Sequence, residues 1–455
     1  MGKAKHIRRR DFLGYSAATA AVVAGASRAT AQSAAGRPVS ANSKIVVGMM
    51  GTGGRGTWLI TEDLVKRPDA EIACVCDVDK SRLNNAANKV EAATGRKPKT
   101  FSDFREMLTD KDIDAIFNST PDHWHALGTV LACQAGKHVY CEKPASHSMW
   151  EGRKMVEAAR KYNRVVQLGT QTRSGPYTFE ARKFITDGKL GDVHLVRVRN
   201  MKLVEPVPVR EDGTPPPGVD YDAWVGPAPL RPFNAGRFHY NWHWVWDYSG
   251  GDIINDGIHQ IDIARYLVGK DFPKTVYSSG GILAGKDAKQ TPDTQLATWD
   301  FGDCLMHFEL ALWTPQMKKM DWMLRDTDEF PDWPFNATMV EIQGTKGMMY
   351  FERHGGGWQA WGVDNKLMGS GNGPHPHGPH IGNFLECVRT GGRPNADIEE
   401  GHRSTLLALM ANISYRLGGR KLTFDHATET FVGDAEANTC CKRTYRDPWR
   451  VSETV

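Results

Sequence analysis

The sequence lacks several features that would place it in a common class of protein. It has only eight cysteines in 455 residues, and none of them forms a C-x-x-C pair or has the spacing of a zinc site. Apart from one stretch near the N-terminus, no run approaches the roughly 18 apolar residues that a membrane-spanning helix needs. No internal repeat is present. These absences favour a globular protein without a structural metal centre.

The first 31 residues differ from the rest and predict an export signal. Residues 8–13, RRRDFL, resemble a twin-arginine (Tat) motif, and the apolar stretch 15–26 that follows is too short to span a membrane. Residues 29–31 fit an A-x-A cleavage site. We therefore expect a signal peptide over 1–31, the Tat export machinery as a partner and a periplasmic location. The alternative is a disordered basic tail.

The charge of the chain is concentrated in this leader. The whole chain has a net charge of +4, and residues 1–31 contain six basic residues and one acidic residue, so the remainder is close to −1. The composition therefore argues against nucleic acid or a membrane surface as a partner after cleavage. Because a Tat substrate folds before export, in a reducing compartment, a disulfide framework is not expected.

The roughly 420 remaining residues predict two domains. After a polar linker, 32–43, apolar strands alternate with helical patterns over 44–169, which predicts a doubly wound parallel sheet. Over 170–435, alternating strand patterns and proline-rich loops predict an α+β domain on a large open, mostly antiparallel sheet. Residues 436–455 form a tail. The fold class is α/β.

A glycine turn organises the first domain. Gly51, Gly53 and Gly56 have the spacing G-x-G-x-x-G between a predicted strand and a predicted helix, and Asp77 ends the next strand twenty-one residues later. Gly51 permits the tight turn, Gly53 lets a pyrophosphate approach the backbone, and Gly56 lets helix and strand pack closely. The helix N-terminus attracts the phosphates. The alternative is an ordinary glycine turn.

The identity of the dinucleotide depends on the acid. Asp77 can accept hydrogen bonds from both ribose hydroxyls of NAD and would repel the 2′-phosphate of NADP, unless Lys80 or Arg82 compensates. We predict NAD, with NADP as the alternative, and include Gly54 and Arg55 of the turn among the cofactor-binding residues.

Two further motifs follow predicted strands of the same sheet. Pro121 and His125 lie in one, and Glu142, Lys143 and Pro144 form the other. Because ligands of open α/β sheets bind beyond the carboxyl ends of the strands, all are predicted to reach the cofactor. Desolvation could lower the pKa of Lys143 enough for proton exchange. The alternative is a surface lysine paired with Glu142.

A third cluster lies in the second domain, over residues 250–262. Asn255 and His259 are four apart, so on one helical turn they share a face. His259 can take a proton from a hydroxyl while hydride leaves the same carbon, and Asp262 could orient it and contribute to the substrate site. The alternative is a structural histidine.

An aromatic run just upstream, 237–248, predicts a sugar site. Tyr240 and Trp242 can stack on sugar rings between hydrogen-bonding groups, and the alternative is a packed aromatic core. The spacing of His239, His243 and Asp247 could be mistaken for a metal site, but hydride transfer needs no metal, so none is predicted.

A glycine/proline loop near the end of the second domain contains three further histidines. They are predicted to be solvated, and they are His375, His377 and His380.

Taken together, these motifs resemble the Gfo/Idh/MocA oxidoreductases, relatives of glucose–fructose oxidoreductase and inositol dehydrogenase. The resemblance rests on the glycine turn and on residues 121–125, 141–144, 255–262 and 395–401. It implies a Rossmann domain, a C-terminal α/β domain, homodimers or homotetramers through the large sheet, and substrates among sugars, polyols and their derivatives.

The resemblance also implies roles for individual residues. Lys143 matches the family lysine and His259 the catalytic histidine, whereas Asn255 replaces an aspartate that many members carry. Exported members resemble glucose–fructose oxidoreductase, in which the nucleotide stays bound, so a tightly bound cofactor is expected. Gln171 and Arg173 are further residues predicted to reach cofactor or substrate.

The predicted function is an exported oxidoreductase in which His259 takes the proton and Lys143 orients the hydroxyl of a sugar or cyclitol. Two alternatives stay open: a redox-assisted glycoside hydrolase or lyase that recycles its NAD, and a sugar-binding module with a structural nucleotide.

Overall fold

The computed structural model describes residues 44–455 apart from 286, 322 and 326. The predicted signal peptide, 1–31, and the linker, 32–43, lie outside the described residues. None of the helices in the described part combines the length and the apolar character needed to cross a membrane.

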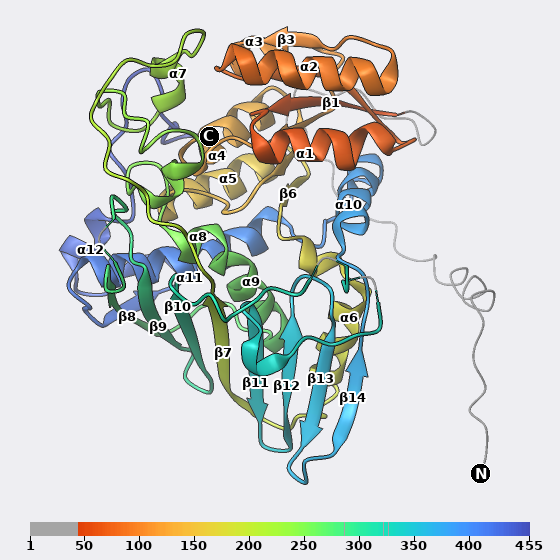
Figure 1. Ribbon diagram of the computed structural model, residues 1–455, viewed down its shortest axis with the longest axis vertical. Helices are drawn as coiled ribbons and strands as arrows, with labels where there is room; N and C mark the ends of the chain where they lie inside the picture. The colour runs from red at the N-terminus through yellow and green to blue at the C-terminus, as the bar shows by residue number, and fades with distance from the viewer. Residues whose placement is uncertain (1–43, 286, 322, 326) are drawn as a thin grey trace, which may run out of the picture. The chain divides into compact units, whose positions relative to one another are not determined.

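The first sheet is a six-stranded parallel sheet of Rossmann type, as predicted (Figure 1). The apolar runs of its strands fit a sheet that is covered on both faces. Its strand order is β3-β2-β1-β4-β5-β6, which places the first strand next to the middle of the sheet. The strands are β1 (Ile45–Met50), β2 (Ala70–Cys76), β3 (Lys99–Phe101), β4 (Ala115–Asn118), β5 (His138–Cys141) and β6 (Val166–Leu168).

The crossover helices of this sheet begin at recognisable caps. The Asp79 side chain accepts hydrogen bonds from the first turn of α2, and Ser148 and Glu151 form a capping box at the start of α5. These side chains satisfy backbone N–H groups that the helix leaves unpaired. The helices are α1 (Gly54–Glu62), α2 (Lys80–Thr94), α3 (Phe104–Leu108), α4 (Asp122–Gln134) and α5 (Met149–Lys161).

The second sheet has ten strands in the order β14-β13-β12-β11-β7-β10-β9-β8-β15-β16. Only β7 and β10 pair in parallel among its described strands, so the sheet is mixed and mostly antiparallel, as predicted. The strands are β7 (Val193–Met201), β8 (Thr275–Gly281), β9 (Thr294–Asp300), β10 (Leu305–Ala311), β11 (Met339–Gly344), β12 (Gly347–Glu352), β13 (Trp358–Gly362), β14 (Leu367–Gly371), β15 (Leu422–Asp425) and β16 (Thr430–Phe431).

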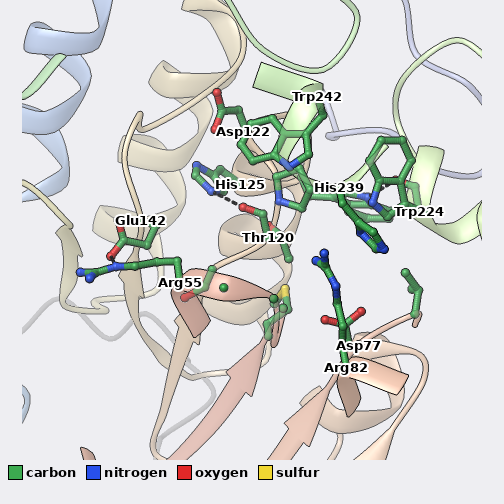
Figure 2. A pocket seen from close by; sticks show the side chains of 18 of the residues that line it. Arg55, Asp77, Arg82, Thr120, Asp122, His125, Glu142, Trp224, His239 and Trp242 are labelled. Carbon is green, nitrogen blue, oxygen red and sulfur yellow. Dashed lines mark hydrogen bonds and ion pairs between the residues drawn. The ribbon is translucent and has the colours of Figure 1, made fainter. Parts of the chain in front are cut away.

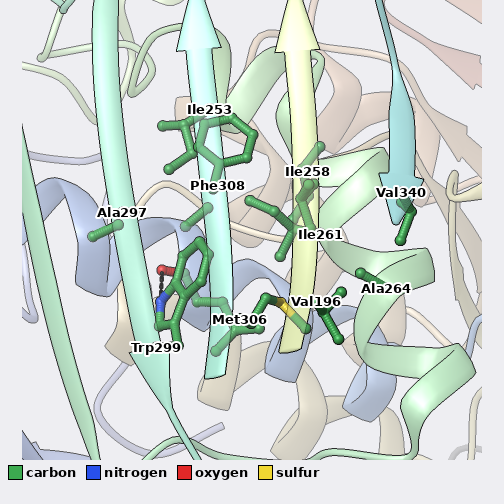
Figure 3. Packing of buried hydrophobic residues seen from close by; sticks show 14 of the residues in the cluster. Val196, Ile253, Ile258, Ile261, Ala264, Ala297, Trp299, Met306, Phe308 and Val340 are labelled. Atoms are coloured by element: carbon green, nitrogen blue, oxygen red, sulfur yellow. Dashed lines mark hydrogen bonds between the residues drawn. The ribbon is translucent and has the colours of Figure 1, made fainter. Parts of the chain in front are cut away.

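Helices cover one face of this sheet. α9 (Gly257–Val268) packs on β7, α11 (Ile398–Arg416) packs on β8, and α6 (Pro176–Thr186) packs on β14. Figure 3 shows the resulting core, in which alternate residues of the strands point toward the helices. Trp299 is fully buried there and donates its indole N–H to the carbonyl oxygen of Leu407, 3.0 Å away.

Late segments of the chain return to the first sheet. Ile381 and Phe384 of α10 (His377–Thr390) are buried with the residues of β1 and β4, and Phe384 meets Phe117 edge to face at 5.6 Å. α11 packs on α5 as well as on β8, so it contacts both domains. The tail is packed too, because Trp449 and Val451 are buried against the α4 side of the Rossmann core.

The core around Trp299 predicts a large stability effect. Replacing Trp299 by alanine leaves a cavity and removes a buried hydrogen bond, so the free energy of unfolding should fall by about 3–5 kcal/mol. Chemical denaturation measures it. Trp313, which is 51% exposed, is the matched control, and Trp313→Ala should change the free energy by less than about 1 kcal/mol. Equal effects of the two substitutions would contradict this account of the core.

Candidate active site

A cavity of about 1150 Å³ opens at the carboxyl ends of the Rossmann strands. Its walls come from the glycine turn, from the loops after β4 and β5, and from three parts of the second domain: residues 220–243, 255–259 and 353–377. Figure 2 shows how the side chains of Arg55, Thr120, His125 and Glu142 gather at the sheet edge. The three motifs predicted at the strand ends therefore meet at one cavity.

The glycine turn has the geometry that a dinucleotide requires. Gly51 has φ +80°, and a Cβ on it would lie 2.8 Å from the backbone of Ser119. A Cβ on Gly56 would lie 2.0 Å from the Gly51 oxygen, so this glycine permits close helix–strand packing as predicted, without lining the cavity. Gly53 caps α1 without a side chain, and a Cβ on Gly54 would meet open space. The N-terminus of α1 is therefore an open cradle for phosphates.

Asp77 lies at the predicted ribose position with an arginine beside it. Its carboxylate accepts hydrogen bonds from the backbone of Thr52, at 2.7 Å, and of Asp79, at 3.0 Å. Burial raises the pKa of Asp77. Arg82 lies next to it (Figure 2), and Arg82 Nη1 would lie 2.6 Å from a Cβ on Gly53. The acid and the arginine thus share this end of the cavity.

Glu142 pairs with Arg55, which excludes the alternative that it pairs with the Lys143 ammonium. Arg55 Nε donates to Glu142 at 2.7 Å, and Arg55 Nη1 donates to His377 Nε2 at 3.0 Å. The ring of His377 stacks on Trp58 with 4.2 Å between centroids. This chain of contacts fixes the glycine turn against the loop after β5 and the start of α10.

His125 connects two of the loops. Its Nδ1 lies 2.7 Å from the carbonyl oxygen of Pro144, and its Nε2 lies 2.9 Å from that of Thr120. Burial lowers the pKa of His125, so the ring is neutral and donates one N–H. His125 and Pro121 both line the cavity, but His125 spends its ring nitrogens on the backbone and is therefore a positioning residue.

Lys143 and His259, from different domains, face the same cavity. Lys143 Nζ donates to the Asn255 carbonyl at 2.8 Å and to Asn255 Oδ1 at 3.1 Å. Burial lowers the pKa of Lys143, while Asp122 opposes that shift. Burial and the charges of Arg353 and Lys143 hold the pKa of His259 well below its usual range. The imidazole is therefore neutral and able to accept a proton.

The helix that was expected to present Asn255 and His259 together is broken between them. Asn255 ends α8 (Asp252–Asn255), and α9 starts at Gly257. Both side chains still line the cavity. The break frees the Asn255 carbonyl, which has no partner further along a continuous helix, to accept the hydrogen bond from Lys143.

Asp256, in that break, is surrounded by cations that the sequence analysis missed. Its carboxylate accepts hydrogen bonds from Lys202 at 2.6 Å and from Lys319 and Arg353. These three charges lower the pKa of Asp256 well below its usual range, against its burial. Because the three cations come from distant parts of the chain, no local motif could have pointed to them.

Two predicted substrate residues lie elsewhere. Arg173 Nε binds both oxygens of Asp262, at 2.8 and 3.0 Å, and Ser404 donates to the same carboxylate at 2.6 Å. Both charged side chains are almost fully buried, and neither lines the cavity. The prediction that they contact substrate, with Asp262 orienting His259, is therefore wrong, because the two charges neutralise each other inside the second domain.

The aromatic run divides between core and cavity. Phe238 and Tyr248 are buried in a small cluster with Trp224, whereas Tyr240 and Trp242 line the cavity. One segment, η4 (His239–Trp244) with the turns around it, thus contributes both to a packed aromatic core and to the wall of the cavity.

The prediction that the three histidines of the glycine/proline loop are solvated is wrong. His375 and His377 line the cavity, and His380 is buried with its Nε2 2.9 Å from the Leu168 carbonyl oxygen. In the part of the chain that the structure describes, no group of three or more His, Cys, Asp or Glu side chains is arranged to hold a metal ion.

Two models of one oxidoreductase family match the chain. The model of the NAD-binding Rossmann fold matches residues 45–170, and that of the C-terminal alpha/beta domain matches 208–299 and 338–451. Together they account for well over half of the chain. The chain belongs to the Gfo/Idh/MocA family. The first domain of this family member is thus an NAD-binding Rossmann domain, and the open cradle at α1 fits that cofactor.

Curated relatives in the family act on sugars and cyclitols. The chain is 24% identical over 251 residues to myo-inositol 2-dehydrogenase of Thermotoga maritima, covering 55% of this chain and 63% of that one. It is 26% identical over 266 residues to D-glucoside 3-dehydrogenase of Escherichia coli, covering 58% and 66%. The chain therefore spans less than two thirds of the length of these relatives.

The fold is shared with solved family structures. The WlbA dehydrogenase of Bordetella pertussis, solved in complex with NADH and UDP-GlcNAcA, superimposes with a TM-score of 0.61 at 23% identity. The match covers 84% of this chain and 99% of that one, so both domains take part in it.

Asp122, which the sequence analysis also missed, lines the cavity as a buried carboxyl. Burial raises its pKa to about 7, and Ser249 Oγ donates to it at 2.5 Å. The folded protein therefore holds a proton that the unfolded chain releases near pH 4. Its contribution to stability is full below about pH 4 and is lost as the pH rises through 7.

This titration predicts the pH dependence of stability. Asn cannot titrate, so Asp122→Asn should lack the loss of stability that this carboxyl causes. The free energy of unfolding of the wild type should fall between pH 4 and 8 by up to about 4 kcal/mol more than that of the variant. Denaturant titrations across this range measure it. Asp332→Asn, at an exposed aspartate, should follow the wild type. An Asp122→Asn curve parallel to the wild type would show that this carboxyl does not titrate in the range.

Proposed function

We propose that this protein is an NAD-dependent oxidoreductase that oxidises a hydroxyl-bearing ring carbon of a sugar, a cyclitol or a derivative. The observation that carries the proposal is the meeting of the Lys143 ammonium and the His259 imidazole, from two domains, at the cavity that begins at the glycine turn. The sugar and cyclitol relatives support the substrate class.

Each residue of the candidate site has a separate role in the proposed reaction. Gly51, Gly53 and the α1 N-terminus would hold NAD, which would supply the acceptor for the hydride. Lys143 is fixed by Asn255 and donates its remaining N–H to the substrate hydroxyl, which sets the orientation of the carbon and stabilises oxygen as it loses its proton. His259, neutral at physiological pH, accepts that proton. Asn255 acts through Lys143 and supplies the amide oxygen where many family members carry an acid.

The aromatic segment supports a retained nucleotide. Trp224, His239 and Trp242 come from the second domain and stand over Asp77 and Arg82 at the far end of the cavity (Figure 2). His239 Nε2 lies 3.3 Å from Asp79, so this cover is tied to the Rossmann domain. The nucleotide stays bound between turnovers. It is NAD rather than NADP, with Arg82 as the residue that could accept a 2′-phosphate.

The proposed function includes export of the protein to the periplasm and assembly into a homo-oligomer. The predicted leader takes the folded, nucleotide-loaded protein to the periplasm through the Tat machinery. The sheet face without helices exposes Tyr277, Leu296 and Leu305, each 45–48% exposed, and it joins the protein into a homodimer or homotetramer.

The retained cofactor predicts what the purified protein contains. Denaturing the mature protein after extensive dialysis should release close to one NAD per chain, identified by chromatography against NAD and NADP standards. Adding a sugar substrate beforehand should convert it to the reduced form, which absorbs near 340 nm. Protein free of nucleotide that binds NAD only weakly would contradict retention and would leave the dehydrogenase reaction itself to be tested with added NAD.

The assignment of the base predicts a selective loss. His259→Ala should lower kcat for reduction of the bound nucleotide by about 10²–10⁴-fold, because the proton has no acceptor, while the nucleotide content stays unchanged. Stopped-flow absorbance measures the rate. His194→Ala, at an exposed histidine, is the control and should react like the wild type. Full activity of His259→Ala would show that another group takes the proton.

A further inference from the structure

The cavity continues past Asp77 to an end that three separate parts of the chain enclose. Because β3 pairs with the end of β2, the backbone N–H of Asp77 donates to the Phe101 carbonyl oxygen at 3.2 Å, and the residues after β3 lie beside the acid. The acid of a dinucleotide site binds the ribose of the adenosine half, and the adenine lies beyond it. This end of the cavity is therefore the place for the adenine. Its walls include Ser102, Phe104, Arg105, Ala223, Trp224 and Trp449.

Trp449 comes from the C-terminal tail, and side chains of the Rossmann domain fix it in this wall. Its ring meets that of Trp124 edge to face at 5.2 Å between centroids, and the Arg105 guanidinium lies 4.3 Å from the ring centroid. Phe104 is buried in the same cluster. Trp449 is 8% exposed and lines the cavity. The tail thus supplies a flat apolar surface, of the kind against which proteins bind a nucleotide base.

Arg446 of the tail holds a second wall in place. Its Nη1 donates to the Asp222 carboxylate at 2.6 Å, its Nη2 to the Asp222 carbonyl oxygen at 2.8 Å and its Nε to the Gly226 carbonyl oxygen at 3.1 Å. These acceptors belong to α7 (Tyr221–Val225) and to the residue that ends it. The backbone N–H of Trp449 in turn donates to the Arg446 carbonyl oxygen at 2.8 Å. One guanidinium of the tail therefore positions a helix that lines the cavity.

Both the tail and α7 are also attached to helices of the Rossmann domain. Trp124 of α4 donates its indole N–H to the Trp224 carbonyl oxygen at 3.0 Å, and a Cβ on Gly226 would lie 2.1 Å from the Trp124 ring, so α7 approaches α4 closely. Tyr445 donates its hydroxyl to Glu151 of α5 at 2.9 Å. The tail is thus a strap that runs from α5 past α4 to α7 and closes this end of the cavity.

We propose that the C-terminal tail is part of the nucleotide site: Trp449 contacts the adenine of bound NAD, and Arg446 holds α7 over the same base. The inference rests on the proposed function and deepens it, because it names the segment that keeps the nucleotide from leaving. A nucleotide enclosed in this way is released only when the contacts between the tail and α7 open.

The end of the cavity that the tail closes is distinct from the end where the reaction takes place. Figure 2 shows Trp224 on the side of Asp77, whereas Glu142, which precedes Lys143, lies on the other side. The tail should therefore affect the binding of ligands that carry an adenosine and no others. ADP-ribose has the adenosine of NAD without the nicotinamide, and nicotinamide mononucleotide (NMN) has the nicotinamide without the adenosine.

The first test compares the binding of NAD, ADP-ribose and NMN by titration calorimetry, in mature protein freed of nucleotide with charcoal. Trp449→Ala should raise the Kd of NAD and of ADP-ribose by about 5–100-fold and leave the Kd of NMN within about twofold of the wild type. Trp449→Phe keeps a flat ring and should bind all three nearly as the wild type does. Trp313→Ala, at a 51% exposed tryptophan, is the control and should match the wild type.

Two outcomes of this test would overturn the inference. An unchanged Kd of NAD in Trp449→Ala would show that the ring does not contact the adenine. An equal loss for NAD and NMN would show that the substitution disturbs the whole site. Circular dichroism identifies a variant that fails to fold, and the second test then decides, because it alters a side chain that is 20% exposed.

The second test measures how fast the nucleotide leaves. Arg446→Met removes three hydrogen bonds between the tail and α7, so NADH should dissociate about 5–50-fold faster than from the wild type. The change in NADH fluorescence after addition of excess NAD measures the rate. Arg450→Met, at a 60% exposed arginine of the same tail, should release NADH at the wild-type rate. Release from Arg446→Met at the wild-type rate would show that the tail does not control how the nucleotide leaves.

The inference and the proposed function can fail separately. If no sugar reduces the nucleotide, the proposed oxidoreductase falls, and the binding and release of the nucleotide still decide the role of the tail. If sugars reduce the nucleotide but the tail variants bind and release it as the wild type does, the oxidoreductase stands and the inference falls.

Discussion

The hydrogen bonds from Lys143 to Asn255 are the contact on which the site depends. They reach from the loop after β5 into the broken helix of the second domain and leave one ammonium N–H for a ligand. A buried ammonium is costly unless it is paired. The first domain therefore cannot place this lysine without the second, and the cavity is formed only when both domains are folded against each other.

The parts of the site that the sequence revealed are those encoded in short segments. A glycine turn, a strand end and a lysine–proline pair each have a local physical cause, and the parallel order of β1, β4 and β5 brings them to one edge. The fold class can be predicted from the sequence equally well, because the hydrophobic periodicities of strands and helices are local patterns. His259 was singled out in the sequence for the same reason, as part of a compact glycine-rich cluster, and the structure places it in the wall of the cavity.

The features of the site that could not be predicted from the sequence depend mainly on ion pairs between residues far apart in the chain. Arg173 and Asp262 were assigned to substrate by their types, but each is the partner of the other, 89 residues apart. Asp256 was overlooked, although Lys202, which follows β7, and Arg353, which follows β12, both bind it. The loop with His375 and His377 looked like a solvated linker because its glycines and prolines hide the fact that α10 begins within it. Electrostatic neutrality is a property of the folded chain and has no local pattern.

The return of α10 to the first sheet has a consequence for how the protein is made. Five residues of α10 complete a core whose other buried members precede residue 170, and they are Ile381, Phe384, Leu385, Cys387 and Val388. A ribosome releases the Rossmann segment long before it releases α10, so the nascent half carries an uncovered apolar surface until translation is nearly finished. The core beneath the nucleotide cradle is therefore completed late. A fragment that ends between the two halves would aggregate or be degraded in the cell and would not form a functional small domain.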